Sequence, residues 1–272
     1  MKLLLLAISV SAVSPLVARA QEETSPPSSA VADQPPTAES VAKAESIIKR
    51  AVAALGGDQY LNVRTVTARG FYTPFQDGAS SVPSTFVDYL VYPNRERTEF
   101  KSGGVRTIQV HTGETGWIYD GAARTLKDMK PPQVKSFQLA LRTSSEFLLR
   151  GWWRQGSAQL SYVGRREAGL AKRNETVKLT HPDGLTVEYE FGARDGLPAK
   201  VIYKSKDDSE EEVTEEDRFA QFIAVGGVLT PVIIDHYQKG VQMSRLNYEN
   251  IQLNALVPDA LFQKPVDVKA VK

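Results

Sequence analysis

The chain has 272 residues, with 33 lysines and arginines against 32 acidic residues, and it contains no cysteine. A near-neutral chain has no overall electrostatic attraction for nucleic acid, and a chain without thiols forms neither disulfides nor thiolate zinc sites. A chain of this length can bury a large hydrophobic core as one domain.

The first twenty residues have the features of a secretory signal peptide. A lysine at position 2 precedes an apolar run over residues 3–13, and Ala-Arg-Ala at residues 18–20 fits the small-residue cleavage pattern. The apolar run is too short for a membrane-spanning helix. We therefore predict cleavage between Ala20 and Gln21 and export to the periplasm, with an uncleaved N-terminal anchor as the alternative.

Residues 21–39 are rich in proline, serine, threonine and acidic side chains, a composition that predicts a disordered linker. The folded domain is expected to span residues 40–272. Its first helix is predicted by apolar residues at steps of three and four, which form the stripe Val41, Ala44, Ile48, Val52 and Leu55. We expect Ser40 to cap this helix and Gly56-Gly57 to end it.

An alternation of period two begins at Val63 and predicts roughly ten to twelve short strands. Glycine, asparagine and proline turns join these strands as hairpins, so the sheet should be antiparallel. The predicted strand segments are 63–74, 84–93, 95–102, 105–113, 115–121, 123–129, 158–168, 175–182, 185–192 and 199–206, followed by hairpins within residues 219–248. Segment 84–93 is apolar on both faces, so we expect it to be covered on both sides.

A second helix is predicted after Pro131-Pro132, over residues 133–153. Its apolar stripe consists of Val134, Phe137, Leu141, Leu148 and Trp152. Further apolar side chains lie off this stripe, so the helix should contact two apolar surfaces. One of them is the sheet, and the other is more core, a ligand or a partner protein.

The segment from Asp207 to Asp217 carries eight acidic residues in eleven positions. We expect a solvated loop here. The alternative is a calcium site, although the spacing and the glycine of an EF-hand loop are absent.

Several short phrases in the chain occur in an order that resembles the LolA-like family of bacterial outer-membrane lipoprotein-sorting proteins, over about residues 41–265. The phrases are Ala53-Ala54-Leu55-Gly56-Gly57, Tyr92-Pro93-Asn94-Arg95, Gly116-Trp117, Asp195-Gly196-Leu197-Pro198, Gly226-Gly227-Val228-Leu229-Thr230-Pro231, and then Pro258, Phe262 and Pro265.

The resemblance implies an α+β, mostly β fold, in which a strongly curved antiparallel sheet forms an incomplete β-barrel with helices packed on its concave side. It also implies an apolar cavity between sheet and helices, where carriers of that family hold lipoprotein acyl chains. We therefore expect a monomeric, non-enzymatic periplasmic binding or carrier protein for lipid or acyl chains, without cofactor, metal or nucleic acid. The alternatives are an envelope protein-interaction module without a cavity, or an enzyme on the same scaffold.

The candidate residues that line the cavity follow from strand alternation and the helical stripe. They are Phe86, Leu90, Ile108, Val110, Trp117, Phe137, Leu141, Leu148, Trp152 and Ile234. A register error of one residue would place the strand members of this set on the opposite face.

No catalytic motif is visible in the sequence, and none of the three histidines lies in a zinc-binding pattern. We therefore assign no catalytic or metal-binding residue. An enzyme on this scaffold would need a polar cluster inside the concavity, for which His111, Asp235 and His236 are the residues to inspect.

Overall fold

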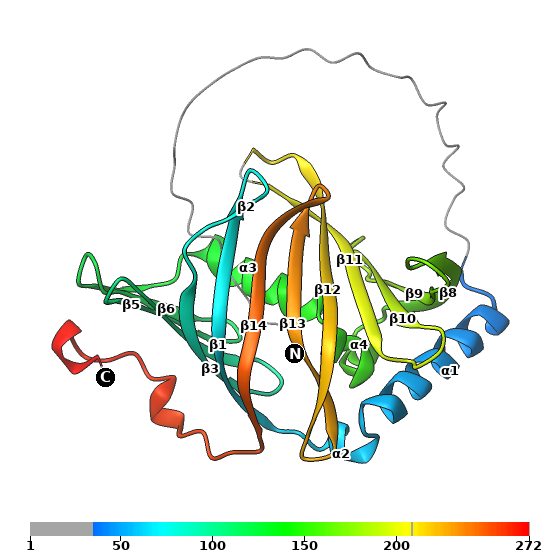
Figure 1. Ribbon diagram of the computed structural model, residues 1–272, viewed down its shortest axis with the longest axis horizontal. Coiled ribbons are helices and arrows are strands. Elements are labelled where there is room, and N and C mark those ends of the chain that lie inside the picture. Colours follow the sequence, from blue (N-terminus) through cyan, green and yellow to red (C-terminus); the bar gives the residue numbers. More distant parts are fainter. Residues whose placement is uncertain (1–34, 208, 272) are drawn as a thin grey trace, which may run out of the picture.

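The computed structural model describes residues 35–207 and 209–271. The predicted signal peptide and most of the predicted linker lie outside these residues. The described chain forms one open, strongly curved antiparallel sheet of 14 strands, with helices on its concave side (Figure 1). The predicted fold class is therefore confirmed.

The sheet consists of two meanders that meet where β1 pairs with β14. Its strand order is β7-β6-β5-β4-β3-β1-β14-β13-β12-β11-β10-β9-β8, and β2 pairs with β1 outside this path. The strands are β1 Thr65–Gln76, β2 Ala79–Ser80, β3 Ser84–Val91, β4 Arg95–Ser102, β5 Val105–Thr112, β6 Gly116–Asp120, β7 Thr125–Asp128, β8 Gln159–Glu167, β9 Arg173–Thr180, β10 Thr186–Gly192, β11 Pro198–Lys206, β12 Glu212–Val225, β13 Val228–Gln238 and β14 Val241–Leu253.

Helix α1 (Ala38–Leu55) packs against β8 and β9 and buries the predicted stripe members Ala44, Ile48 and Leu55. Its N-cap is Thr37, whose side chain accepts a hydrogen bond from the Ser40 backbone N–H. The N-cap thus lies three residues before Ser40, the predicted cap. The short helix α2 (Asp58–Leu61) follows the Gly56-Gly57 stop.

The predicted second helix is broken into α3 (Pro131–Thr143), α4 (Ser145–Leu149) and the 3-10 turn η1 (Trp152–Gln155). The break falls at Ser144, whose backbone is extended and whose hydroxyl accepts a hydrogen bond from the Phe147 N–H. A serine side chain competes with the backbone in this way, and it favours caps over helix interiors. The apolar stripe continued through the break, so the sequence pattern did not reveal it.

The core lies mostly between the concave face of the sheet and helices α1 and α4. A second, smaller cluster covers the opposite, outer face of β3, β5 and β6, where Val257 and Phe262 of the C-terminal tail pack. The tail contains the 3-10 turns η2 (Asp259–Leu261) and η3 (Val268–Ala270). Strand β3 is therefore covered on both sides, as predicted.

The second half of the acidic segment is a strand and not a solvated loop, which corrects the prediction. Strand β12 begins at Glu212, and Glu215 and Asp217 are buried on the same face as Phe219. The buried residues Val213, Glu215, Asp217 and Phe219 alternate with exposed or half-buried neighbours, so the acidic run conceals an ordinary strand pattern.

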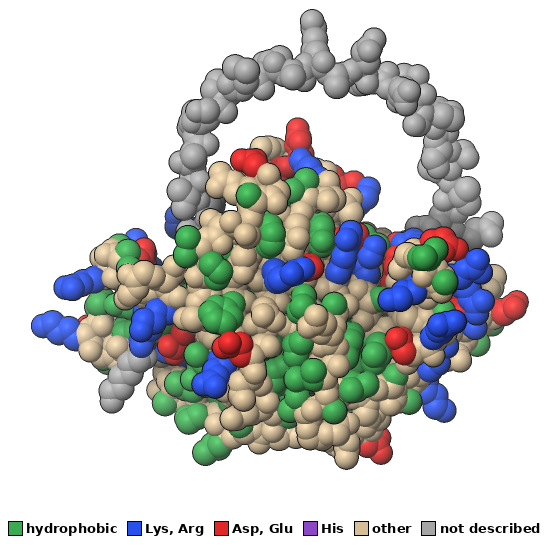
Figure 2. Space-filling view, viewed as in Figure 1, with side chains coloured by type: hydrophobic (Ala, Val, Ile, Leu, Met, Phe, Trp, Pro, Cys, Tyr) green, Lys and Arg blue, Asp and Glu red, His purple; other side chains and the backbone are tan. Residues whose placement is uncertain are grey.

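The outer face of the central strands is a mixed surface. Figure 2 shows hydrophobic side chains interspersed with charged and polar ones on this face, and Phe71 and Met243 are among the exposed apolar residues. Within the described part of the chain, no helix has both the length and the apolar character needed to cross a membrane.

Candidate ligand-binding site

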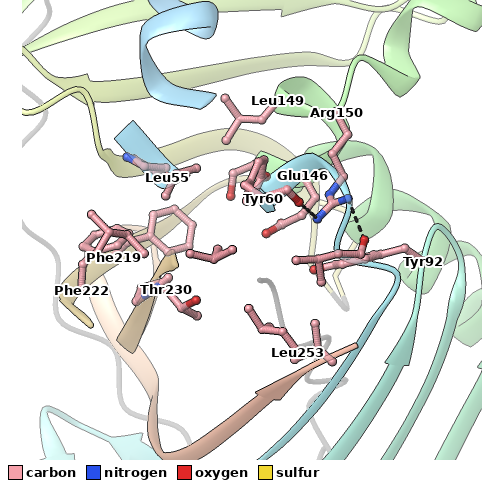
Figure 3. Close-up of a pocket in the computed structure, with 17 residues that line it drawn as sticks. Leu55, Tyr60, Tyr92, Glu146, Leu149, Arg150, Phe219, Phe222, Thr230 and Leu253 are labelled. Atoms are coloured by element: carbon pink, nitrogen blue, oxygen red, sulfur yellow. Dashed lines mark hydrogen bonds between the residues drawn. The ribbon is translucent and has the colours of Figure 1, made fainter. Parts of the chain in front are cut away.

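Two pockets lie between the concave face of the sheet and the helices. The first encloses about 480 Å³ of empty space, counting its opening (Figure 3). Its walls come from helices α1, α2 and α4 and from strands β1, β11, β12, β13 and β14. Its lining residues are mostly apolar or aromatic: Leu55, Tyr60, Val63, Val66, Tyr92, Ser145, Glu146, Leu149, Arg150, Pro198, Phe219, Phe222, Val228, Leu229, Thr230, Pro231 and Leu253.

The second pocket, of about 410 Å³ by the same measure, lies between strands β3 and β4 and helix α3. Its walls are Leu90, Val91, Tyr92, Pro93, Arg95, Glu96, Phe137, Ala140, Leu141, Ser144, Glu146 and Trp152. Tyr92 and Glu146 line both pockets, so the two cavities adjoin. Mostly apolar walls with a few polar groups are typical of small-ligand sites.

Arg150, at the C-terminal end of α4, fixes the wall of the first pocket. Its guanidinium donates hydrogen bonds to the backbone oxygens of Tyr60 (2.9 Å), Leu61 (3.2 Å) and Val63 (3.0 Å). It also lies 4.3 Å from the centroid of the Tyr92 ring, and Figure 3 shows it between the two tyrosines. This cation is therefore engaged in holding α2 and the start of the sheet against α4.

Three buried carboxylates gather on the helix side of β3 and β4. Asp88 is 0% exposed, Glu96 is 4% exposed and Glu146 is 5% exposed. Asp88 accepts a hydrogen bond from the Thr98 hydroxyl (2.9 Å) with one oxygen, and its other oxygen has no hydrogen-bond partner among the described residues. Burial, reinforced by the nearby Glu96, raises the pKa of Asp88 well above its usual range.

Two tyrosines border these carboxylates. Burial raises the pKa of Tyr248 well above its usual range, and the charges of Asp88 and Glu96 add to this effect. The Tyr248 hydroxyl has no hydrogen-bond partner among the described side chains and backbone. Burial also raises the pKa of Tyr92, with Glu146 as the next cause. Both phenols therefore stay neutral at physiological pH.

The three residues His111, Asp235 and His236 do not form one cluster. His111 on β5 stacks on Phe137 of α3 at 4.1 Å between ring centroids, and burial lowers its pKa to about 4. His236 lies elsewhere on the concave side, on β13. Asp235 forms a two-pronged ion pair with Arg245, at 2.6 and 2.8 Å, on the opposite face of β13.

His236 is held between two buried carboxylates. Its Nδ1 lies 2.8 Å from Asp217 and its Nε2 lies 3.1 Å from Glu215. Burial lowers the pKa of His236, but the hydrogen bonds to Asp217 and Glu215 outweigh burial and raise it to about 9. The imidazole is therefore protonated at neutral pH with both nitrogens occupied, and it cannot accept a proton as a general base. Within residues 35–207 and 209–271, no set of three histidine, aspartate or glutamate side chains is placed to hold a metal ion.

The structure distributes the ten predicted lining residues over three environments. Leu90, Phe137, Leu141 and Trp152 line the second pocket. Phe86, Leu148 and Ile234 lie in the concave-side core, outside the walls of either pocket. Ile108, Val110 and Trp117 lie on the opposite face, under the C-terminal tail.

The placement of the last three residues corrects the expected orientation of β5 and β6. Strand β5 is buried on both faces, because Gln109 and His111 face α3 while Ile108 and Val110 face the tail. Apolar alternation selected Ile108 and Val110 but could not tell which side the helices cover. The Trp117 indole donates a hydrogen bond to the Phe262 backbone oxygen (3.0 Å), which fixes it on the tail side.

None of the ten predicted lining residues is in the wall of the first pocket. Tyr60 is on the four-residue helix α2, which is too short to show a periodic pattern, and Arg150 carries a charge. Phe219 and Phe222 are three residues apart and would face opposite sides of a regular strand. Both line the pocket because the backbone of Gln221 between them has a positive φ of 54°. An irregularity of this kind breaks the alternation that sequence reasoning relies on.

No model of a known protein family matches the chain, and no curated protein matches it either. Solved structures do match. A DUF1329 family protein from Desulfovibrio piger has a TM-score of 0.55 at 10% identity, covering 81% of this chain and 97% of that one. A LolA superfamily protein from Nitrosomonas europaea has a TM-score of 0.53 at 15% identity, with the same coverage of 81% and 97%.

An outer membrane lipoprotein-sorting protein domain from Vibrio parahaemolyticus has a TM-score of 0.53 at 11% identity, covering 82% of this chain and 97% of that chain. At identities this low, the likeness establishes the fold and leaves the activity to be argued from the site. The curved sheet, the helices on its concave side and these matches together show that the chain has the LolA-like fold.

Proposed function

We propose that this chain is a periplasmic binding or carrier protein for an apolar ligand such as lipid or the acyl chains of lipoproteins. The observation that carries the proposal is the pair of adjoining, mostly apolar pockets between the concave sheet and the helices. The LolA superfamily and lipoprotein-sorting proteins of the same fold support it. The predicted signal peptide supports the periplasmic location, and we propose that the protein acts as a monomer.

The physical basis of binding is the apolar area that a chain-like ligand removes from water. Each Å² of apolar surface contributes roughly 25 cal/mol before ordering costs are subtracted. Leu55, Leu149, Phe219 and Leu253 offer such area in the first pocket, and Leu141 and Phe137 offer it in the second. A ligand spanning both pockets passes Tyr92 and Glu146, which they share.

Two experiments test this function. Native mass spectrometry of the purified protein should show co-purified lipid, and the delipidated protein should bind a non-ionic twelve-carbon detergent saturably below its micellar concentration. Leu141→Gln, in the wall of the second pocket, should weaken that binding about tenfold, because it puts an amide into an apolar wall.

The matched control is Leu170→Gln, because Leu170 is 98% exposed and lies in the turn between β8 and β9. This control should bind as the unmodified chain does. The absence of both co-purified lipid and saturable detergent binding would contradict the proposed function.

A further inference from the structure

We infer that the first pocket has a mouth that opens toward a lipid bilayer. This mouth is a split in the sheet between the start of β13 and the end of β14, at the lower end of the sheet in Figure 1. Its rim, formed by Leu61, Ile223 and Leu256, docks on the membrane surface. The inference rests on the proposed function, because an apolar ligand that passes directly between bilayer and pocket avoids water.

The ladder between β13 and β14 covers only part of the two strands. Its last pair is Ile233 with Asn247, and among the described residues no earlier residue of β13 pairs with a later residue of β14. Pro231 lies in this part of β13 and has no N–H to donate, a feature that confines proline to the edges of sheets. The start of β13 therefore pairs with β12 alone.

A bulge in β14 begins where this ladder ends. On its other side β14 pairs with β1, and Glu249 is an extra residue between the partners of Arg69 and Gly70. A β-bulge bends the strand that carries it. Because Glu249 is two residues after Asn247, the bend falls where β14 leaves β13, and the two strands diverge from there (Figure 1).

The first pocket lies behind this split. Its walls include residues 228–231 of β13 on one side and Leu253, the last residue of β14, on the other. Figure 3 shows Thr230 and Leu253 bordering the same space. Leu229 and Leu253 are only half-buried, so solvent reaches this side of the pocket. The split is therefore a path into the apolar interior.

Helix α2 spans the two sides of the mouth. Asn254, just after β14, accepts a hydrogen bond from the Arg64 N–H (2.7 Å) and donates one to the Asn62 backbone oxygen (3.4 Å), which fixes the end of β14 beside α2. On the other side, Gly227 of the β12–β13 turn lies so close to Gln59 of α2 that an added Cβ would collide with the Gln59 amide. The three elements thus form one continuous rim.

Three exposed apolar side chains lie on this rim. Leu61 on α2 is 38% exposed, Ile223 on β12 is 46% exposed and Leu256, in the tail after β14, is 92% exposed. Each is within three residues of a wall residue of the first pocket. Figure 2 shows hydrophobic side chains gathered toward the lower end of the molecule. Single exposed apolar residues are ordinary, but three from separate elements around one apolar opening favour an apolar partner.

The distribution of charge favours a bilayer as that partner. Residues 219–234, which form the end of β12, its turn and the start of β13, contain no charged side chain, although 24% of the chain is charged. The exposed charges nearest to Leu61 in the sequence are Asp58 and Arg64, which cancel. An uncharged apolar rim enters a bilayer interface without removing ions from water, and it has no preference for anionic lipid.

The test uses the exported protein, with its N-terminus confirmed as Gln21, and phosphatidylcholine vesicles, with bound protein separated by flotation. We expect binding that is equal at low and high salt, because it involves no net charge. Ile223→Ser and Leu256→Ser should each weaken it about tenfold, since each removes one apolar side chain from the contact. The control Leu170→Ser changes an equally exposed leucine away from the mouth and should bind as the unmodified chain does.

A second measurement uses the absence of cysteine from the chain. An environment-sensitive dye attached to Ile223→Cys or Leu256→Cys should shift its emission to shorter wavelength when vesicles are added. The same dye on Leu170→Cys should not respond. This reading is independent of how strongly a serine substitution affects folding.

The serine variants should bind dodecyl maltoside as the unmodified chain does, because none of these residues lines a pocket. Absence of vesicle binding, its loss at high salt, or an equal dye response at Leu170→Cys would overturn the inference. If the detergent still binds in those cases, the apolar-ligand function stands. Failure of both vesicle and detergent binding would overturn both proposals.

Discussion

The histidines of this chain lie in environments that shift their pKa in opposite directions. His236 has a pKa of about 9, because the hydrogen bonds to Asp217 and Glu215 outweigh burial. Burial lowers the pKa of His111 to about 4, and burial followed by the charge of Arg142 lowers the pKa of His181. Residue type alone gives none of these values, because each depends on partners that are distant in the sequence.

The raised pKa of His236 predicts a pH dependence of stability. An unfolded histidine titrates near 6.5, so the imidazolium stabilises the fold fully below that pH, and this stabilisation is lost as the pH rises through about 9. Its size is at most about 3 kcal/mol for a shift of this extent. Denaturant unfolding of His236→Gln should therefore show a smaller fall in the free energy of unfolding between pH 6.5 and 9.5 than the unmodified chain.

The control is His181→Gln. Because the pKa of His181 is lowered, its contribution changes only below pH 6.5, and this variant should keep the full loss of stability above that pH. Parallel pH profiles of His236→Gln and the unmodified chain would refute the role assigned to the Asp217–His236–Glu215 contacts.

At the scale of single strands and helices, the sequence predicted most of what the structure contains. The strand segments from residue 63 to 206 match β1 and β3 to β11 within a few residues, since alternation and turn residues both mark them. The Gly226-Gly227 and Lys239-Gly240 turns likewise join β12, β13 and β14. The start of β12 was not predicted because it lies in an acidic run, which is typical of a solvated loop. The break at Ser144 was not predicted because the apolar stripe of the helix continues through it.

A close approach between strands gives an element-scale prediction. Gly70 lies at the β1 bulge opposite β14, where an added Cβ would collide with the backbone oxygen of Asn247 and lie 2.9 Å from the Tyr248 Cα. Gly70→Ala should therefore separate the two strands that join the meanders. We expect a loss of about 2–4 kcal/mol in the free energy of unfolding.

Gly156→Ala is the matched control for Gly70→Ala. Nothing lies within 4 Å of a Cβ added at Gly156, and its φ of −128° is ordinary for alanine. Chemical denaturation of both variants checks the pair, and similar stabilities would show that β1 and β14 can move apart freely at the bulge.

At the scale of the whole molecule, the sheet separates two apolar regions with different roles. The concave side, covered by helices, holds both pockets, while the outer face of β3, β5 and β6 is sealed by the C-terminal tail. Sequence alternation identified apolar positions in both regions and assigned them to one cavity. Distinguishing them requires the path of the tail, and this path is a property of the assembled fold that no local pattern encodes.

The two regions each contain a tryptophan, which makes the separation measurable. Trp152 lines the second pocket and lies 5.8 Å from the Tyr92 ring, whereas Trp117 is bound to the tail through Phe262. Ligand entering the pocket should change the environment of Trp152 alone. We expect dodecyl maltoside to change the intrinsic fluorescence of the unmodified chain saturably, and Trp152→Phe to lose most of that change.

Trp117→Phe is the matched substitution on the outer face. It removes the indole hydrogen bond to Phe262, so it should lower the unfolding temperature, yet it should retain the fluorescence response with an unchanged apparent affinity. A response that disappears with Trp117→Phe and persists with Trp152→Phe would place the ligand under the tail. In that case the sequence-based choice of Ile108, Val110 and Trp117 would describe the binding surface better than the concave pockets do.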